Sequence, residues 1–194
     1  MKIALDIGHS TRTGTIINGA DEHEESAHNA AVLKNILEHY GCTVDIIDFP
    51  HTSNTADLSA TIKAVNSGNY AAVISLHCDS SSNPAARGAH VCFNRTYRQD
   101  GSYTNSTRGQ ALAKEIASRL CPQMPGRANK IQPRPDRALN LSSLAILRQT
   151  IPPAVLVEVG FLSNPEDLER IRSLRHELMT SIAQGLIAWL GITI

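Results

Sequence analysis

Short apolar runs alternate with helical patterns along the chain. Ile3, Leu5 and Ile7 alternate with polar or small residues up to Gly8, which predicts a first strand that ends at His9. The runs at 71–77 and 154–159 are apolar enough to be covered on both faces of a sheet. Further strands are predicted at 43–49 and 89–93.

Helical spacing of apolar residues separates these strands. It predicts helices over 24–40 and 57–65. A third helix is predicted from an N-cap at Ser106 to Leu120. Asn164 as N-cap and Pro165 at the first helical position start a last helix, which we expect to continue unbroken almost to the C-terminus. Residues 122–137 hold four prolines and no apolar period, so they predict a surface loop.

Strands that alternate with helices predict an α/β fold. We expect residues 1–194 to form a single domain, with a twisted, mostly parallel sheet and helices on both faces. A chain of 194 residues is long enough to bury a core without disulfides, and its four cysteines show no metal-binding spacing, so we expect free thiols.

Charge and hydropathy exclude several classes of protein. Lys plus Arg and Asp plus Glu both number 18, which leaves no basic excess to bind nucleic acid. No apolar stretch approaches the ~20 residues of a transmembrane helix, and the N-terminus lacks the apolar core of a signal peptide. We therefore expect a soluble protein that is made in the cytoplasm.

Three predicted strands end in side chains that can do chemistry. His9, His77 and Glu158 fall at carboxyl ends of strands, where the ligands of open α/β sheets bind. Glu158 interrupts an apolar strand, so its charge needs compensation, and a salt bridge to Arg148 is the plain structural alternative to a catalytic role.

Two histidines and one acid form the ligand set of many hydrolytic zinc sites, so a further acid is needed. The candidates lie at the start of the first helix, where acids also offset the helix dipole, and spacing alone does not select among them. The cluster comprises Asp21, Glu22, His23, Glu24, Glu25 and His28.

Four segments follow one another along the chain: IALDIGHS, an acid at the start of a helix, ISLHCDS, and AVLVEVGFLSNPED. In order and spacing they resemble the type 3 family of zinc-dependent N-acetylmuramoyl-L-alanine amidases. The resemblance implies that His9, an acid at 24 or 25, and His77 hold Zn²⁺, while Glu158 is catalytic. The family usually has Asn four residues after its ligand Glu, and Asn29 favours Glu25 over Glu24.

The sequence departs from the family pattern at several positions. Ser10 and Thr11 replace two glycines, which predicts a stiffer loop after His9. Thr61 stands in place of an Arg, and Asp79 in place of an Asn. We expect these last two changes to affect substrate contacts and specificity rather than metal binding.

The implied reaction is zinc-dependent hydrolysis of the amide between N-acetylmuramic acid and L-alanine of peptidoglycan. Glu158 would move the proton from water to the leaving amine, and Arg148 would orient Glu158 or bind a carboxylate of the stem peptide. A zinc peptidase that cleaves within the stem peptide is the alternative enzyme, and a non-catalytic wall-binding module is the alternative from another class. We expect a monomer that reaches the cell wall through a phage-type release.

Overall fold

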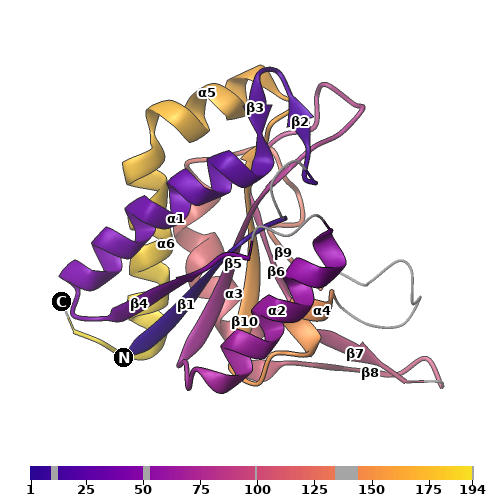
Figure 1. Ribbon diagram of the computed structural model, residues 1–194. Coiled ribbons are helices and arrows are strands. Elements are labelled where there is room, and N and C mark those ends of the chain that lie inside the picture. Colours follow the sequence, from indigo (N-terminus) through magenta and orange to yellow (C-terminus); the bar gives the residue numbers. More distant parts are fainter. Residues whose placement is uncertain (10–12, 50–52, 99, 134–143, 194) are drawn as a thin grey trace.

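The computed structural model describes residues 1–9, 13–49, 53–98, 100–133 and 144–193. Its centre is a six-stranded sheet in the order β4-β1-β5-β10-β6-β9 (Figure 1). The strands are β1 (Lys2–Ile7), β4 (Thr43–Ile47), β5 (Ala72–Asp79), β6 (His90–Phe93), β9 (Ile131–Pro133) and β10 (Ala154–Phe161). Strands β4, β1, β5 and β10 are parallel, whereas β6 runs antiparallel to β10, so the prediction of a mostly parallel sheet is confirmed.

Helices cover both faces of the sheet (Figure 1). Side chains of α1 (Glu22–His39), α3 (Thr107–Leu120) and α6 (Arg175–Leu190) share the larger core with Leu5, Ile74 and Val155. The neighbouring strand residues Ala4, Val73 and Leu156 point to the opposite face, where they form the smaller core with α2 (Asn54–Ser67) and α4 (Ala145–Arg148).

Side-chain caps fix where several helices begin. The Asp21 carboxylate accepts from His23 N at 2.9 Å, so α1 starts at Glu22, two residues before its predicted start. Ser106 caps α3 and Asn164 caps α5 (Pro165–Ser173), as the sequence predicted.

The prediction of one unbroken C-terminal helix is wrong. Leu174, with φ of −108° and ψ of 22°, separates α5 from α6. Apolar residues keep their helical spacing on both sides of this break, and neither Gly nor Pro marks it, so the pattern conceals it. The change of direction brings Arg172 and Arg175 to the same acidic partner on α1.

Two small hairpins and one sheet strand were not predicted. Strands β2 (Ile16–Ile17) and β3 (Ala20–Asp21) form one hairpin, and β7 (Arg95–Tyr97) and β8 (Tyr103–Asn105) form the other. Strand β9 lies inside the expected surface loop, where Val91 pairs with Ile131. The loop prediction is therefore wrong there, and its residues 134–137 lie outside the described residues.

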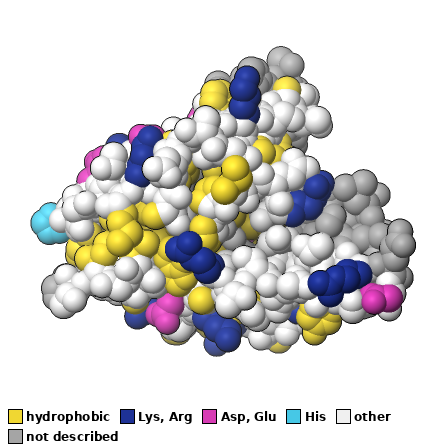
Figure 2. Space-filling model, turned by 90° about the horizontal axis from the view of Figure 1, so that it is seen from below, with side chains coloured by type: hydrophobic (Ala, Val, Ile, Leu, Met, Phe, Trp, Pro, Cys, Tyr) yellow, Lys and Arg dark blue, Asp and Glu magenta, His cyan; other side chains and the backbone are white. Residues whose placement is uncertain are grey.

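All four cysteines are free and buried. Among the described residues, no helix is both long and apolar enough to cross a membrane. On the face shown in Figure 2, Lys and Arg side chains are scattered rather than gathered into one basic surface.

Candidate metal centre and active site

A pocket of about 480 Å³ opens at the carboxyl ends of β1, β5 and β10. His77 is paired with Glu158 across β5 and β10, so the two side chains leave the sheet on the same face. That face is the one covered by α2 and α4, because Leu156, two residues before Glu158, belongs to the smaller core. His9, Glu22, His77, Asp79 and Glu158 all line the pocket.

His9, Glu22 and His77 meet in this pocket. Glu22 Oε1 lies 3.1 Å from His77 Nδ1 and 3.3 Å from His9 Nε2. The two imidazole rings are 5.0 Å apart between centroids and nearly perpendicular, at 77°. Two imidazoles thus converge on one carboxylate oxygen, although the three residues come from distant parts of the chain.

Glu22 is held in place by the backbone around it. Its Oε2 accepts from Thr15 N at 3.1 Å, and its own N–H donates to Thr15 O at 2.9 Å. Burial raises the pKa of Glu22, but hydrogen bonds and charge from His77 and His9 outweigh burial, so the pKa lies well below its ordinary value. The carboxylate is therefore ionised and preorganised.

The backbone at Gly8 and His9 allows the histidines to approach. A Cβ atom on Gly8 would lie 2.4 Å from His77 Cε1, so only glycine fits there without moving the ring. His9 has a φ of 62°, in the left-handed region that a side chain rarely adopts. Strain at a residue that aims its side chain into a pocket is a feature of functional sites.

The three side chains suit a divalent metal ion. A tetrahedral Zn²⁺ with bonds of about 2.0–2.2 Å places its ligand atoms roughly 3.3–3.6 Å apart. The distances of 3.1 and 3.3 Å from Glu22 Oε1 to the histidine nitrogens are close to that spacing. Nitrogen and oxygen donors of this kind fit zinc among the common metals.

Glu25, the expected acidic ligand, does not lie in this group, and Glu22 stands in the place where the sequence led us to expect it. Glu25 Oε1 accepts from Arg172 Nε at 2.8 Å, and Glu25 Oε2 accepts from Arg175 Nη2 at 2.6 Å. Burial raises the pKa of Glu25, but the two arginines outweigh it and hold this pKa below its ordinary value. Glu25 therefore joins α1 to the C-terminal helices.

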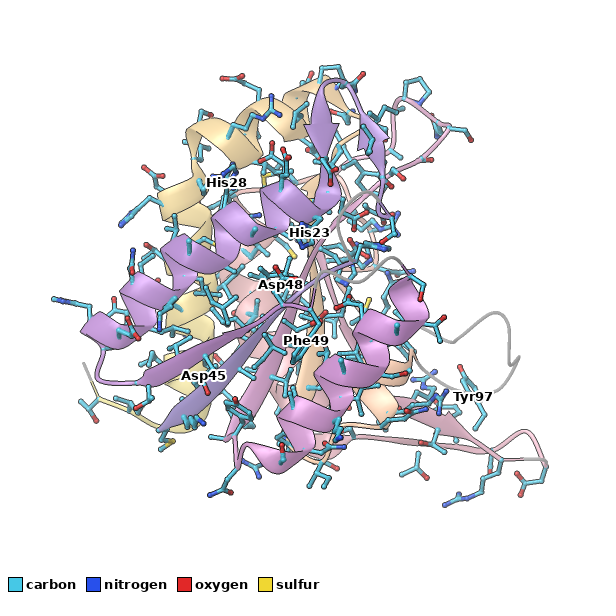
Figure 3. All side chains as sticks on the ribbon, in the orientation of Figure 1. His23, His28, Asp45, Asp48, Phe49 and Tyr97 are labelled. Atoms are coloured by element: carbon cyan, nitrogen blue, oxygen red, sulfur yellow. The ribbon has the colours of Figure 1, made fainter. Side chains whose placement is uncertain are left out.

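Asp21, His23 and His28, from the same cluster at the start of α1, also lie outside the group formed by His9, Glu22 and His77. His23 Nε2 lies 3.2 Å from Asp48 Oδ1, and these two side chains lie beside each other in Figure 3. His28, one turn and a half further along α1, is exposed. Asp21 caps the helix. This N-cap is the signal in the sequence that makes Glu22 the first helical residue.

Glu158 lines the pocket, whereas Arg148 does not. Glu158 is buried, at 4% exposure, and lines the pocket beside His77. Arg148 ends α4, and although Leu144, Ala145 and Ile146 line the pocket, Arg148 is not among the lining residues. Its Nε is buried without a hydrogen-bond partner among the described residues. A role for Arg148 in substrate binding stays a prediction.

The residues that depart from the family pattern lie in different parts of the structure. Thr61 is buried on α2 and, with Ser75, forms hydrogen bonds to Asp6. Asp79 lines the pocket. Ser10 and Thr11 lie outside the described residues, so the expected stiffness of their loop stays a prediction.

A second cluster contains a residue that the sequence reasoning missed. Asp79, His90 and Glu158 offer ligand atoms that all lie within 4.8 Å of one another. His90 is fully buried on β6, directly opposite Glu158 on β10. A polar residue in the otherwise apolar run at 89–93 was the available signal.

The fold is that of amidase catalytic domains. The catalytic domain of CD27L, an endolysin targeting Clostridia difficile, superposes with a TM-score of 0.77 at 27% identity over 97% of each chain. The N-acetylmuramyl-L-alanine amidase Ami1 of Mycobacterium smegmatis superposes with a TM-score of 0.78 at 22% identity, over 100% of this chain and 98% of Ami1.

Sequence comparison gives the family. Residues 3–188 match the type 3 amidase family, described as N-acetylmuramoyl-L-alanine amidase, and the chain belongs to this family. It is 27% identical over 95% of its length to N-acetylmuramoyl-L-alanine amidase CwlM of Bacillus licheniformis. It is 30% identical over 96% of its length to the probable cell wall amidase LytH of Staphylococcus saprophyticus. The chain spans 65% and 57% of these two relatives.

Proposed function

We propose that this protein is a zinc-dependent N-acetylmuramoyl-L-alanine amidase that cleaves peptidoglycan between the lactyl group of N-acetylmuramic acid and L-alanine. The observation that carries the proposal is the convergence of His9, Glu22 and His77 in one pocket with Glu158, in a chain of the amidase family. Two imidazoles and one carboxylate leave Zn²⁺ a net positive charge and an open position.

His9, Glu22 and His77 would hold the ion through Nε2, Oε1 and Nδ1, the atoms that already approach one another. A bound Zn²⁺ supplies a Lewis acid that polarises the amide carbonyl and makes water more acidic. The Thr15 N–H holds the second oxygen of Glu22 and so keeps Oε1 directed at the histidines.

Glu158 is the proposed general base. Its carboxylate accepts a proton from the attacking water as the new C–O bond forms. The same group then donates this proton to the amine of L-alanine as the C–N bond breaks, which leaves a lactyl carboxylic acid and a free amino group. Glu158 is in register with His77 on the adjacent strand, so the two side chains lie on one face of the sheet, which supports these proposed roles.

Substrate recognition in this proposal relies on polar contacts. Aromatic residues make up only 4% of the chain, which leaves little surface for stacking against sugars. Asp79 and Ser80 line the pocket and are available to the peptide stem. Arg148 is the proposed partner of a stem carboxylate or of Glu158.

The proposal is tested by mass spectrometry of purified peptidoglycan after digestion, with and without added Zn²⁺. Amidase activity releases intact stem peptides that begin with a free L-alanine amine, and it leaves the glycan strands uncut. Fragments that arise from cleavage within the stem would instead identify a zinc peptidase. Binding to the wall without release of any fragment would identify a non-catalytic wall-binding module.

A further inference from the structure

A second set of potential metal ligands surrounds Glu158 and consists of Asp79, His90 and Glu158. Glu158 on β10 pairs with His77 on β5 and, on its other side, with His90 on β6. Residues that face each other across paired strands project from the same face of the sheet. Asp79, two residues beyond His77 on β5, completes the set with His90 and Glu158.

The ligand atoms of this set are close enough for one ion to join them. One nitrogen of His90 and one carboxylate oxygen each from Asp79 and Glu158 lie within 4.8 Å of one another. Ligands of a tetrahedral ion are roughly 3.3–3.6 Å apart, so small side-chain rotations bring the three atoms to bonding distance. The set shares no residue with His9, Glu22 and His77.

Burial makes a cation favourable at this position. His90 is 0% exposed and Glu158 is 4% exposed. The Glu158 carboxylate is buried and that of Asp79 is partly exposed; two carboxylates this close repel each other, and a divalent cation between them removes that cost. Asp79 Oδ1 accepts from Ser80 N at 2.9 Å, and Arg127 Nη2 lies 3.8 Å from Asp79 Oδ2, at the outer limit of an ion pair, so this arginine compensates the charge of Asp79 only weakly.

The residue at position 79 sets the charge of this group. The family resemblance leads one to expect a neutral Asn there, and this chain has an Asp. An Asn would offer one neutral carbonyl oxygen, whereas Asp79 contributes a negative charge and a stronger ligand. The acidic residue therefore turns a pocket-lining position into part of a candidate cation site.

We propose that Asp79, His90 and Glu158 form a second, inhibitory site for a divalent transition metal ion such as Zn²⁺ or Co²⁺. Imidazole nitrogen together with carboxylate oxygen favours this class of metal over Mg²⁺ and Ca²⁺. The inhibitory effect rests on the proposed function: an ion bound to Glu158 occupies the carboxylate that would accept the proton of water.

Metal binding tests the site without reference to catalysis. We expect calorimetric titration of the metal-free protein with Zn²⁺, checked by elemental analysis after gel filtration, to show two equivalents. The Glu22→Gln variant, which removes the proposed first site, should keep one equivalent. His90→Gln should also keep one, with the second binding step weakened by about tenfold or more.

Asp79→Asn provides a variant that leaves the buried core unchanged. It should weaken the second binding step in the same way as His90→Gln. His28→Gln is the matched control, because His28 is an exposed histidine, and it should keep both equivalents. A single equivalent in the wild-type protein would overturn the proposal. A second equivalent that survives both Asp79→Asn and His90→Gln, or is lost in His28→Gln, would also overturn it.

Activity gives the second readout. In the wild-type protein, we expect peptidoglycan hydrolysis to fall by about tenfold or more between one equivalent and a large excess of Zn²⁺. The ratio of these two rates should approach one in Asp79→Asn. If the protein binds two equivalents but hydrolyses no peptidoglycan, the second site stands and the proposed function fails. If hydrolysis occurs with one equivalent bound at saturation, the proposed function stands and the second site fails.

Discussion

The Glu25 carboxylate and the Arg175 guanidinium fasten the first long helix to the last one. Arg175 Nη2 donates to Glu25 Oε2 at 2.6 Å, and Arg175 Nη1 donates to Glu25 O at 3.1 Å and to Asn29 Oδ1 at 2.6 Å. Arg172 Nε donates to the other carboxylate oxygen at 2.8 Å. One buried acid on α1 thus satisfies two arginines from the C-terminal helices.

Replacing Glu25 should therefore lower the stability of the protein and leave its metal binding unchanged. In Glu25→Ala, Arg175 loses its carboxylate partner in a largely buried position and keeps only neutral acceptors, so we expect the free energy of unfolding to fall by about 1–3 kcal/mol. Zn²⁺ content should stay that of the wild-type protein. Urea denaturation and elemental analysis measure the two quantities.

Glu38→Ala is the control for this substitution. Glu38 pairs with Lys34 on the exposed face of the same helix, so we expect a loss of only about 0.3–0.5 kcal/mol. A Glu25→Ala protein with unchanged stability and no bound metal would restore Glu25 as a ligand.

Glu22→Gln should have the opposite effect. The amide keeps the shape of the side chain but removes the charge on which His9 and His77 converge. Substitution of a residue that only supports a metal ligand lowers metal affinity by roughly 10–100-fold. Because Glu22 is itself a proposed ligand, we expect the affinity of the first site for Zn²⁺ to fall by more than that. Glu24 is exposed, so Glu24→Gln should keep the metal. Equal loss of Zn²⁺ in both variants would contradict the assignment of Glu22.

Glu158→Gln should separate catalysis from metal binding. We expect peptidoglycan hydrolysis to fall by about 10²–10⁴-fold, because the amide cannot accept the proton of water. The site formed by His9, Glu22 and His77 should stay occupied, which elemental analysis at one equivalent of Zn²⁺ would show. Hydrolysis at the wild-type rate would remove Glu158 from the mechanism.

Gly8→Ala should disturb the metal site through packing alone. The new methyl group would lie 2.4 Å from His77 Cε1, so the imidazole must move away from Glu22. We expect weaker Zn²⁺ binding in a protein that still folds, as checked by circular dichroism and calorimetric titration. Unchanged affinity would show that His77 can shift without leaving the metal.

The buried Asp6 should make stability depend on pH. Burial raises its pKa to about 7, the Ser75 hydroxyl opposes this, and Asp57 and Asp48 add to it. In the unfolded chain the pKa is 3.8, so between these values the folded state holds a proton that the unfolded state has released. Asp6 therefore costs stability increasingly as pH rises from about 4 to about 7.

Asp6→Asn should remove this cost. The amide oxygen can still accept from Ser75 Oγ, and no charge is buried at high pH. We expect the variant to be more stable than the wild-type protein by about 1–3 kcal/mol at pH 8, with a much smaller difference at pH 4. Denaturation midpoints at the two pH values measure this, and an equal difference at both would argue against ionisation of Asp6 as the cause.

The elements that build the sheet could be predicted because their apolar runs are long and bounded. The strand at 154–159 and the helix capped by Ser106 are examples in which pattern and cap agree. The break at Leu174 could not be predicted, since the apolar spacing continues across it with no Gly or Pro, and the contacts that accompany it, from Arg172 and Arg175 to Glu25, join residues far apart in sequence.

The histidines and Glu158 could be located from the ends of strands, but their acidic partner could not. Glu22 and Glu25 lie one turn apart on α1, and both are buried acids. The approach of Arg172 and Arg175 to Glu25, and of His77 to Glu22, decides between them. Both contacts depend on residues far away in sequence, so local spacing contains no information about them.

The hydrogen bonds from Arg172 and Arg175 to Glu25 also affect when the fold can be completed during synthesis. Arg172 and Arg175 follow Glu25 by 147 and 150 residues, so the ribosome must make almost the whole described chain before α1 can dock fully. Glu22 begins that same helix. We therefore expect the proposed metal site to form late in biogenesis, so that the nascent, half-made chain would lack the proposed activity.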